Sequence, residues 1–284
     1  MSDSYLNLFI NSAYAAGDEL AIFSLMLLFL GRMLPIISLS PFLGSRVLPN
    51  PVKVALAICL FVIMLPQLLL QAKHPLYFDS TLILYLFKEM FIGLSMGFII
   101  SIPFTCVQAA GMIIDHQRGG ASLMVNDPTI QNQSSPFGTL FNMVLIYVFY
   151  FINGPFILFD AISQSYEVVP VDQFLNPAFY APSSPFWINM IKLFNDVMKI
   201  SIQMCTPALI AILMTDVFLG IANRLAPQVQ ITFLGMPLKS LLAILIVWAG
   251  WFLMTDEFAR QSRLWLQKVN EMVSFFKVPE ALQK

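Results

Sequence analysis

Two long uncharged apolar runs in the middle of the chain, residues 90–114 and 137–159, constrain its fold more than any other feature. About 20 apolar residues in a helix, at a rise of about 1.5 Å per residue, are enough to cross the hydrocarbon of a bilayer. An isolated strand would leave its backbone polar groups unsatisfied in lipid. Both runs are therefore predicted to be membrane-class helices.

The composition extends this prediction to the whole chain, since hydrophobic residues make up 58 % and charged residues 11 % of its 284 positions. An average soluble domain has about 25 % charged residues. We expect an all-α, polytopic membrane protein with about six long hydrophobic helices, at residues 20–42, 54–72, 82–114, 137–159, 193–222 and 229–254. The net charge of −1 does not provide the basic field that attracts nucleic acid, so no nucleic-acid partner is expected.

The chain is predicted to hold one helical membrane domain, residues 20–256, between an acidic leader, 1–19, and an amphipathic charged C-terminal tail, 257–284. The leader lacks the basic start and the long apolar core of a signal peptide, so we expect it to be retained. Acidic residues in the leader and in residues 160–192 predict an external N-terminus. Six crossings would then place the lysine- and arginine-containing tail outside as well. Either one segment does not cross fully, or the usual bilayer picture does not apply to this protein.

Helix-breaking and small residues punctuate the predicted spans. A proline lies in or at the edge of every span: Pro35, Pro66, Pro103, Pro155, Pro207 and Pro237. Broken helices in membranes usually face protein or a water-filled path, although membrane helices also tolerate proline in general. Gly93 and Gly97 form a G-x-x-x-G pair that permits close helix packing, either within the chain or between subunits.

Charged residues inside the spans are candidates for interior positions, because each costs roughly 2.5 to 3.5 kcal/mol in hydrocarbon. They are Arg32, Lys88, Glu89, Lys199, Asp216 and Lys239. Lys88 and Glu89 are adjacent and are predicted to seek separate partners, with snorkelling to an interface as the alternative for Lys88 and Lys239. Asp216 is too short to snorkel, so we expect it to pair with Arg224, two helical turns further on, or with a basic residue of another subunit.

Motifs for catalysis, cofactor binding and metal binding are missing from the sequence. The two histidines, His74 and His116, lie in connecting segments, and the three cysteines are scattered in apolar runs without metal-ligand spacing. No phosphate-binding loop, nucleophile elbow or zinc-protease motif occurs. We therefore expect a protein that is not an enzyme and that needs no cofactor.

A polar loop of unusual length, residues 115–136, joins the two central runs. Connections between neighbouring helices need about 2 to 8 residues, so the extra length indicates a function of its own. Its glycines permit backbone conformations that other residues avoid, and three apolar residues at 123–125 form a short patch. The candidate loop residues are Asp115, Gln117, Arg118, Gly119, Gly120, Leu123, Met124, Val125, Asp127, Pro128, Ser134 and Ser135.

Part of this loop resembles the SctT/FliR family of type III secretion export-apparatus proteins, in the order and spacing of Asp115, Gln117, Arg118, Gly119, Asp127, Pro128, Ser134 and Ser135. The resemblance continues along the chain through Arg32, Pro41, Gly44, Pro49, Lys53, Pro66, Asn153, Gly154, Ser165, Pro170, Arg224, Pro227, Gln228, Gly235, Pro237 and Lys239. The tripeptide Gln117, Arg118, Gly119 is more similar to the virulence injectisome branch than to the flagellar branch.

The resemblance implies a subunit of the export gate in the bacterial inner membrane, a multi-pass protein that forms a pore with subunits of the SctR, SctS and SctU types. Unfolded exported proteins would pass through this pore, and the central loop would plug it. Much of the helical mass would then lie above the lipid plane, which would explain the topology conflict. Two other functions stay open from the residues alone: a stand-alone secondary transporter and a purely structural membrane scaffold.

Overall fold

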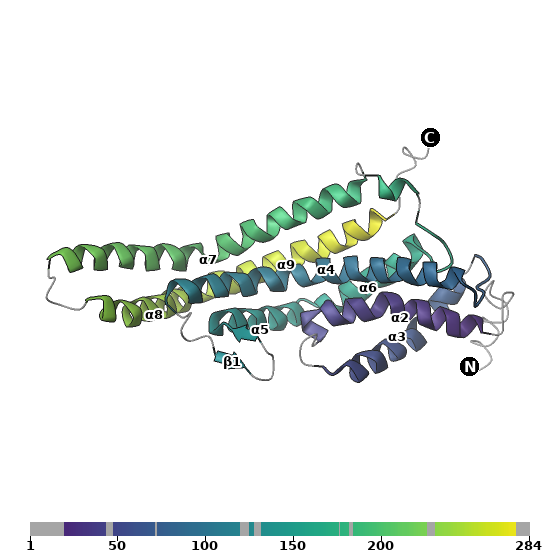
Figure 1. Ribbon diagram of the computed structural model, residues 1–284, viewed down its shortest axis with the longest axis horizontal. Coiled ribbons are helices and arrows are strands. Elements are labelled where there is room, and N and C mark those ends of the chain that lie inside the picture. Colours follow the sequence, from purple (N-terminus) through teal and green to yellow (C-terminus); the bar gives the residue numbers. More distant parts are fainter. Residues whose placement is uncertain are drawn as a thin grey trace. The chain divides into compact units, whose positions relative to one another are not determined.

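The computed structural model describes residues 20–43, 48–71, 73–119, 125–127, 132–175, 177–181, 184–225 and 231–276 (Figure 1). The helices in these ranges confirm the predicted all-α fold. They are α2 (Ala21–Leu39), α3 (Asn50–Leu70), α4 (Thr81–Gln117), α5 (Pro136–Phe151), α6 (Gly154–Val168), α7 (Pro185–Leu225), α8 (Ile231–Ala249) and α9 (Trp251–Ser274), with short 3-10 turns η2 (Pro41–Leu43) and η4 (Pro177–Tyr180). The predicted leader, residues 1–19, lies outside the described residues.

Four of the six predicted spans are single helices that are long and apolar enough to cross a membrane: α2, α3, α4 and α7. The other two predicted spans, 137–159 and 229–254, are broken helices. Each is a pair of helices, with a bend of 73° between α5 and α6 and of 64° between the part of α8 that begins at Pro237 and α9. The described residues thus contain four to six candidate spans, depending on whether each bent pair crosses as one.

The break between α5 and α6 has a local cause. Asn153 adopts a left-handed backbone conformation with φ of 58°, which a short polar side chain tolerates better than most. Pro155 follows in the first turn of α6, where its missing N–H has no helical partner to lose. The chain therefore ends one helix and starts another inside a run that hydropathy alone reads as a single span.

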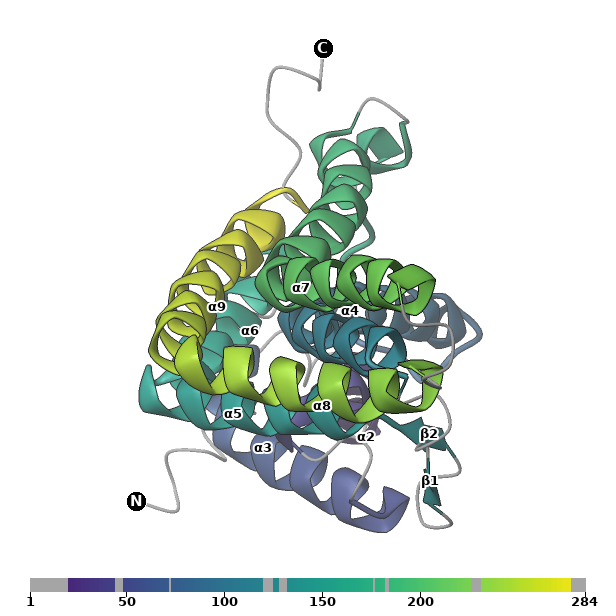
Figure 2. The ribbon, with the colours of Figure 1, turned by 90° about the vertical axis from the view of Figure 1, so that its left-hand side faces the viewer.

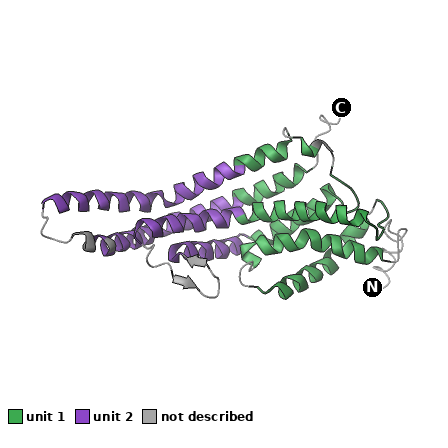
Figure 3. Cartoon of the chain, viewed as in Figure 1, with its two compact units in different colours: residues 1–101, 153–192, 264–284 green, residues 102–152, 193–263 purple. Residues whose placement is uncertain are grey.

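The chain divides into two compact units, coloured separately in Figure 3. Unit 1 comprises residues 1–101, 153–192 and 264–284, and unit 2 comprises residues 102–152 and 193–263. Three helices, α4, α7 and α9, contribute residues to both.

In unit 1, α2 and α3 lie side by side in both ribbon views (Figure 1, Figure 2). Phe29 of α2 joins them to α6, since its ring centroid lies 5.5 Å from those of Phe61 and Tyr166. Phe179 and Phe186 form a second aromatic group with Phe276, with ring centroids 4.9 to 5.7 Å apart. These buried rings position α2, α6 and the start of α7 around one core.

The G-x-x-x-G pair packs inside the chain, which decides between the two predicted alternatives. A Cβ atom added to Gly93 would lie 2.2 Å from the carbonyl oxygen of Arg32, and one added to Gly97 would lie 3.0 Å from that of Pro35. The backbones of α4 and α2 can approach this closely only because both positions are glycine. The contact brings Arg32 against the α4 surface that carries Lys88 and Glu89.

Unit 2 is built around Phe104, Phe141 and Leu145, which are buried. The ring centroids of Phe104 and Phe149 lie 5.5 Å apart, and those of Phe141 and Phe258 lie 5.9 Å apart. Phe258 belongs to α9, whose first turns extend past the predicted end of the last span. The predicted tail, residues 257–284, is therefore helical as far as Ser274. Its last residues, 277–284, lie outside the described residues.

Candidate functional sites in the buried charges and the loop base

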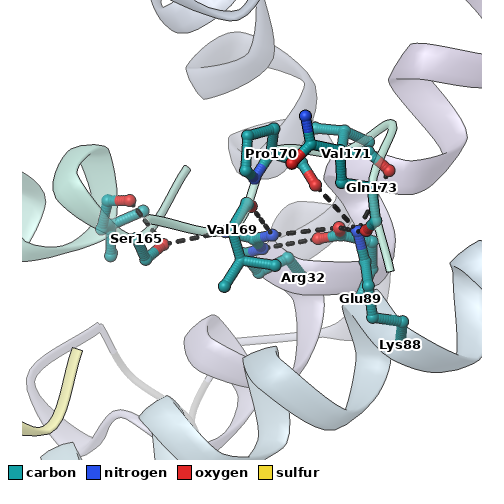
Figure 4. Close-up of polar contacts among 9 residues, drawn as sticks. Arg32, Lys88, Glu89, Ser165, Val169, Pro170, Val171 and Gln173 are labelled. Carbon is teal, nitrogen blue, oxygen red and sulfur yellow. Dashed lines mark hydrogen bonds and ion pairs between the residues drawn. The ribbon is translucent and has the colours of Figure 1, made fainter. Parts of the chain in front are cut away.

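Arg32 lies fully buried in the middle of α2. Its guanidinium forms a two-pronged contact with Glu89 of α4, in which Nε donates to Oε2 and Nη2 donates to Oε1 at 3.0 Å. Nη1 donates to the Ser165 hydroxyl at 3.0 Å, and Nη2 also donates to the Val169 carbonyl at 2.9 Å (Figure 4). The same group lies 4.0 Å from the ring centroid of Tyr166, so an aromatic ring adds a cation–π contact to the hydrogen bonds of this buried cation.

Lys88 lies beside this pair, and its side chain is 4 % exposed. Its Nζ forms an ion pair with Glu89 Oε1 at 2.8 Å. The two neighbours therefore pair with each other, which was not predicted, and each also has the separate partner that was predicted, Arg32 for Glu89 and backbone carbonyls for Lys88. Snorkelling is also excluded for Lys88, because Nζ donates into the protein to the carbonyls of Pro170, Val171 and Gln173.

Asp172 is a buried acid of this group that the sequence reasoning missed. Its Oδ2 accepts hydrogen bonds from the backbone N–H groups of Lys73 at 2.8 Å and His74 at 2.6 Å. The sequence offers no signal for it, because it lies in a polar connecting segment where an aspartate is usually solvated. The described residues of unit 1 therefore include three buried bases, Arg32, Lys53 and Lys88, and two buried acids, Glu89 and Asp172.

The base of the central loop is tied together in unit 2 by Asp115, which is 1 % exposed. Its Oδ1 accepts from Arg118 Nε at 2.7 Å and pairs with Nη2 at 2.6 Å. Its Oδ2 accepts from the Ser135 hydroxyl and from the Phe137 N–H at 2.9 Å. Ser135 in turn caps α5 by accepting from the Gly138 N–H at 2.9 Å. Both ends of the loop are thus fixed to one carboxylate.

Close packing of α4 on α5 supports this base. A Cβ atom on Gly111 would lie 2.4 Å from the backbone nitrogen of Gly138, so the helices touch directly. Arg118 lies over the Phe137 ring, 4.8 Å from its centroid. Gly119 then leaves α4 with φ of 87°, a conformation that glycine adopts without steric cost.

The described part of the loop forms a two-stranded antiparallel ribbon, β1 (Val125–Asp127) with β2 (Asn132–Ser134). Val125 pairs with Ser134, and Asp127 pairs with Asn132. Of the other predicted loop residues, Gln117 ends α4, while Gly120, Leu123, Met124 and Pro128 lie outside the described residues.

Asp216 of α7 pairs with Lys239 of α8, and the predicted pairing with Arg224 was wrong. Arg224 is eight positions further along the same helix, which places it about 12 Å away along the axis, whereas α8 brings Lys239 alongside. The Asp216 side chain is 42 % exposed and that of Lys239 is 21 % exposed. Lys199 was predicted to lie in the interior, but its side chain is exposed. Arg224 is exposed as well.

No group of three or more histidine, cysteine, aspartate or glutamate side chains is placed to hold a metal ion within the ranges the structure describes. His116 and Cys59 are exposed, whereas Cys106 and Cys205 are buried. The chemistry of the described part of the chain is therefore that of buried ion pairs and helix packing.

Comparison with known proteins places this architecture in a family. Residues 23–264 match the family described as bacterial export proteins, family 1. The Yop proteins translocation protein T of Yersinia pestis is 32 % identical over 217 residues, which are 76 % of this chain and 78 % of that protein. The secretion system apparatus protein SsaT of Salmonella typhimurium is 29 % identical over 218 residues, 76 % and 80 % of the two chains.

A flagellar protein gives a similar match. The flagellar biosynthetic protein FliR of Bacillus subtilis is 32 % identical over 201 residues, which cover 70 % of this chain and 75 % of that protein. The matched family region contains the buried charge cluster and the loop base described above. The predicted resemblance is thereby confirmed, and the chain belongs to the bacterial export protein family 1, the SctT/FliR family of type III secretion and flagellar export proteins.

Proposed function

We propose that the chain is a subunit of the export gate of a type III secretion system, and that its central loop, residues 115–136, closes the gate at rest. It would form a pore with subunits of the SctR, SctS and SctU types, through which unfolded proteins cross the bacterial inner membrane. Its role would be conduction and closure, without catalysis. The Gln117, Arg118, Gly119 sequence favours a virulence injectisome over a flagellar basal body.

Family membership and the apolar helices support the cellular setting. The chain is a multi-pass inner-membrane protein of the export-apparatus family. Only 22 % of the most apolar window of α7 is buried within the chain, against 72 % for α4. A helix as apolar and as uncovered as α7 needs lipid or another protein against it.

The observation that carries the closure role is the fixed base of the loop. Because Asp115 binds both Arg118 and the start of α5, residues 119–134 leave and re-enter the helices at one place. Joining two ends that already touch requires only a short turn, so the intervening residues are available for something other than connection. Apolar residues at 123–125 suit a narrow lumen, since a hydrophobic constriction can block ions by excluding water.

The experiment shortens the loop within residues 120–133 and keeps Asp115, Ser135 and Pro136. The complex should still assemble, because the base is intact, but membranes that contain it should leak small ions and solutes. A second variant replaces residues 120–133 with Gly and Ser at unchanged length. It should also leak, because it lacks the apolar patch. Permeability is compared at matched complex levels.

Other outcomes point to other functions. An unchanged permeability with intact assembly would reduce the loop to a solvated connector and would favour a structural scaffold. Solute binding and transport by the purified chain alone would favour a secondary transporter. The chain can also be expressed in strains that lack their own SctT or FliR protein. Restoration of flagellar motility but not of type III protein secretion would contradict the injectisome assignment.

A further inference from the structure

The Lys88 ammonium lies inside a cage of four oxygen atoms (Figure 4). Nζ is 2.9 Å from the Pro170 carbonyl oxygen, 3.0 Å from that of Val171 and 2.8 Å from that of Gln173. The fourth oxygen is Oε1 of Glu89, at 2.8 Å. An ammonium has three protons, so four oxygens surround it as they would surround a bound ion rather than a simple hydrogen-bond donor.

Three of these oxygens come from a single turn, the segment that follows α6. Carbonyl dipoles that converge on one point repel one another unless a cation lies between them. A lysine that needed only a counter-ion would be satisfied by Glu89, whose Oε1 it already shares with Arg32. The turn is thus shaped around a positive charge, and Arg32 fixes its first carbonyl, that of Val169.

The spacing identifies the class of cation that fits. Oxygen ligands lie at 2.3 to 2.6 Å from Ca²⁺ and at about 2.0 to 2.1 Å from Mg²⁺, and both are shorter than the distances of 2.8 to 3.0 Å seen here. Backbone carbonyls at such spacing are the ligands that replace the hydration shell of K⁺ in selectivity filters. The cage therefore suits an ammonium or a monovalent ion of similar size.

We propose that residues 170–173 and Glu89 form a monovalent-cation site whose natural occupant is the tethered ammonium of Lys88. The site fastens the turn after α6 onto α4. Removal of the side chain beyond Cβ leaves the four oxygens with room for a free cation. The Lys88→Ala variant then binds ammonium, a short primary alkylammonium ion or K⁺. This proposal is independent of the export-gate function.

The experiment uses the full chain, extracted from membranes together with its bound partners into an amine-free buffer. Melting temperatures are measured at constant ionic strength, with tetramethylammonium chloride replaced stepwise by n-propylammonium chloride or by KCl. Tetramethylammonium has no N–H donor and is too large for the cage. Propylammonium restores the atoms that the Lys88→Ala substitution removes.

The wild type should melt at the same temperature in every salt. Lys88→Ala should melt several degrees lower in tetramethylammonium and should recover, with saturation, as propylammonium or K⁺ is added. Lys88→Met is the matched control, because its thioether fills the space without charge. It should be destabilised in every salt without recovery. Lys199→Ala, at an exposed lysine of α7, should behave as the wild type.

Three results would overturn the proposal. The first is a Lys88→Ala melting temperature that is independent of the cation. The second is equal recovery of Lys88→Met, which would place the salt effect elsewhere. The third is failure to obtain Lys88→Ala even when cells are extracted directly into propylammonium or K⁺, since an oxygen cage of this kind would have accepted the substitute. Recovery by propylammonium but not by K⁺ would restrict the site to N–H donors and contradict the K⁺ arm.

Discussion

Single residues in this protein act through very close contacts between helices. Arg32 is fully buried, and its charge is neutralised by a carboxylate from another helix. Removing one partner of such a pair leaves an uncompensated buried charge, which typically costs about 3 to 5 kcal/mol. The pair forms only because Gly93 lets α4 approach the Arg32 backbone.

Substitution of Gly93 therefore tests whether the Arg32–Glu89 pair depends on the close packing of α2 on α4. Gly93→Ala would place a Cβ atom 2.2 Å from the Arg32 carbonyl oxygen, so α2 and α4 must separate and the Arg32–Glu89 pair must weaken. We expect a large fall in melting temperature and in membrane yield. The matched control is Gly220→Ala in α7, where nothing lies within 4 Å of the added atom. There the helix propensity of alanine should raise stability by up to about 1 kcal/mol. Equal behaviour of the two variants would contradict the close packing.

At the scale of elements, α7 and α8 differ from the buried helices because they carry a half-exposed ion pair on an apolar surface. Large apolar side chains of the same stretch of α7, such as Met214, Val217 and Phe218, are exposed. Exposed ion pairs in water contribute about 0.2 to 1 kcal/mol, but a single charge in hydrocarbon costs roughly 2.5 to 3.5 kcal/mol. The pair is therefore important mainly because either charge, without its partner, would be costly to keep in hydrocarbon.

Asp216→Ala should accordingly lower the yield of the assembled complex, since it leaves Lys239 without its acid. Adding Lys239→Met should recover part of the loss, because the uncompensated charge is removed. Lys192→Ala, at an exposed position near the start of the same helix, serves as the control and should assemble normally. Complex yield is measured by co-purification from membranes. Wild-type yield from the Asp216→Ala single variant would show that the pair has no part in assembly.

At the scale of the whole molecule, the chain exposes many large apolar side chains. Phe151, Phe218, Trp248 and Phe252 are each more than 70 % exposed, on helices of the candidate spans. Surfaces of this kind are covered by lipid or by other subunits. With the proline-broken helices and the half-exposed ion pair, they indicate a chain that completes its packing in a complex.

We therefore expect the chain to be an obligate complex member. Purified alone in a mild detergent it should aggregate or elute as a broad distribution, and co-expression with its proposed SctR- and SctS-type partners should give a single sharp species. Size-exclusion chromatography with light scattering measures both. A stable, monodisperse monomer would contradict the prediction. An unrelated membrane protein, co-expressed at the same level in place of the partners, controls for the effect of co-expression itself.

Part of the candidate sites could be predicted from the sequence. Charges in apolar runs single out Arg32, Lys88 and Glu89, because an unpaired charge in hydrocarbon is costly. Their pairing could not be predicted, since it depends on the crossing of α2 and α4 and on a turn 80 residues away in the chain. Asp172 shows the same limit, because its burial results from neighbours that are distant in sequence.

The all-α membrane class, the approximate positions of the spans and the family could all be predicted from the sequence, because hydropathy and motif spacing are local properties of the chain. Only the tertiary structure decided that Lys239 and not Arg224 meets Asp216, and that one carboxylate holds both ends of the loop. It also decided that the predicted spans at 137–159 and 229–254 are bent pairs of helices. These outcomes depend on which helices lie side by side. They could not be predicted from the sequence, because a contact between two side chains that are distant in the chain leaves no periodic pattern in it.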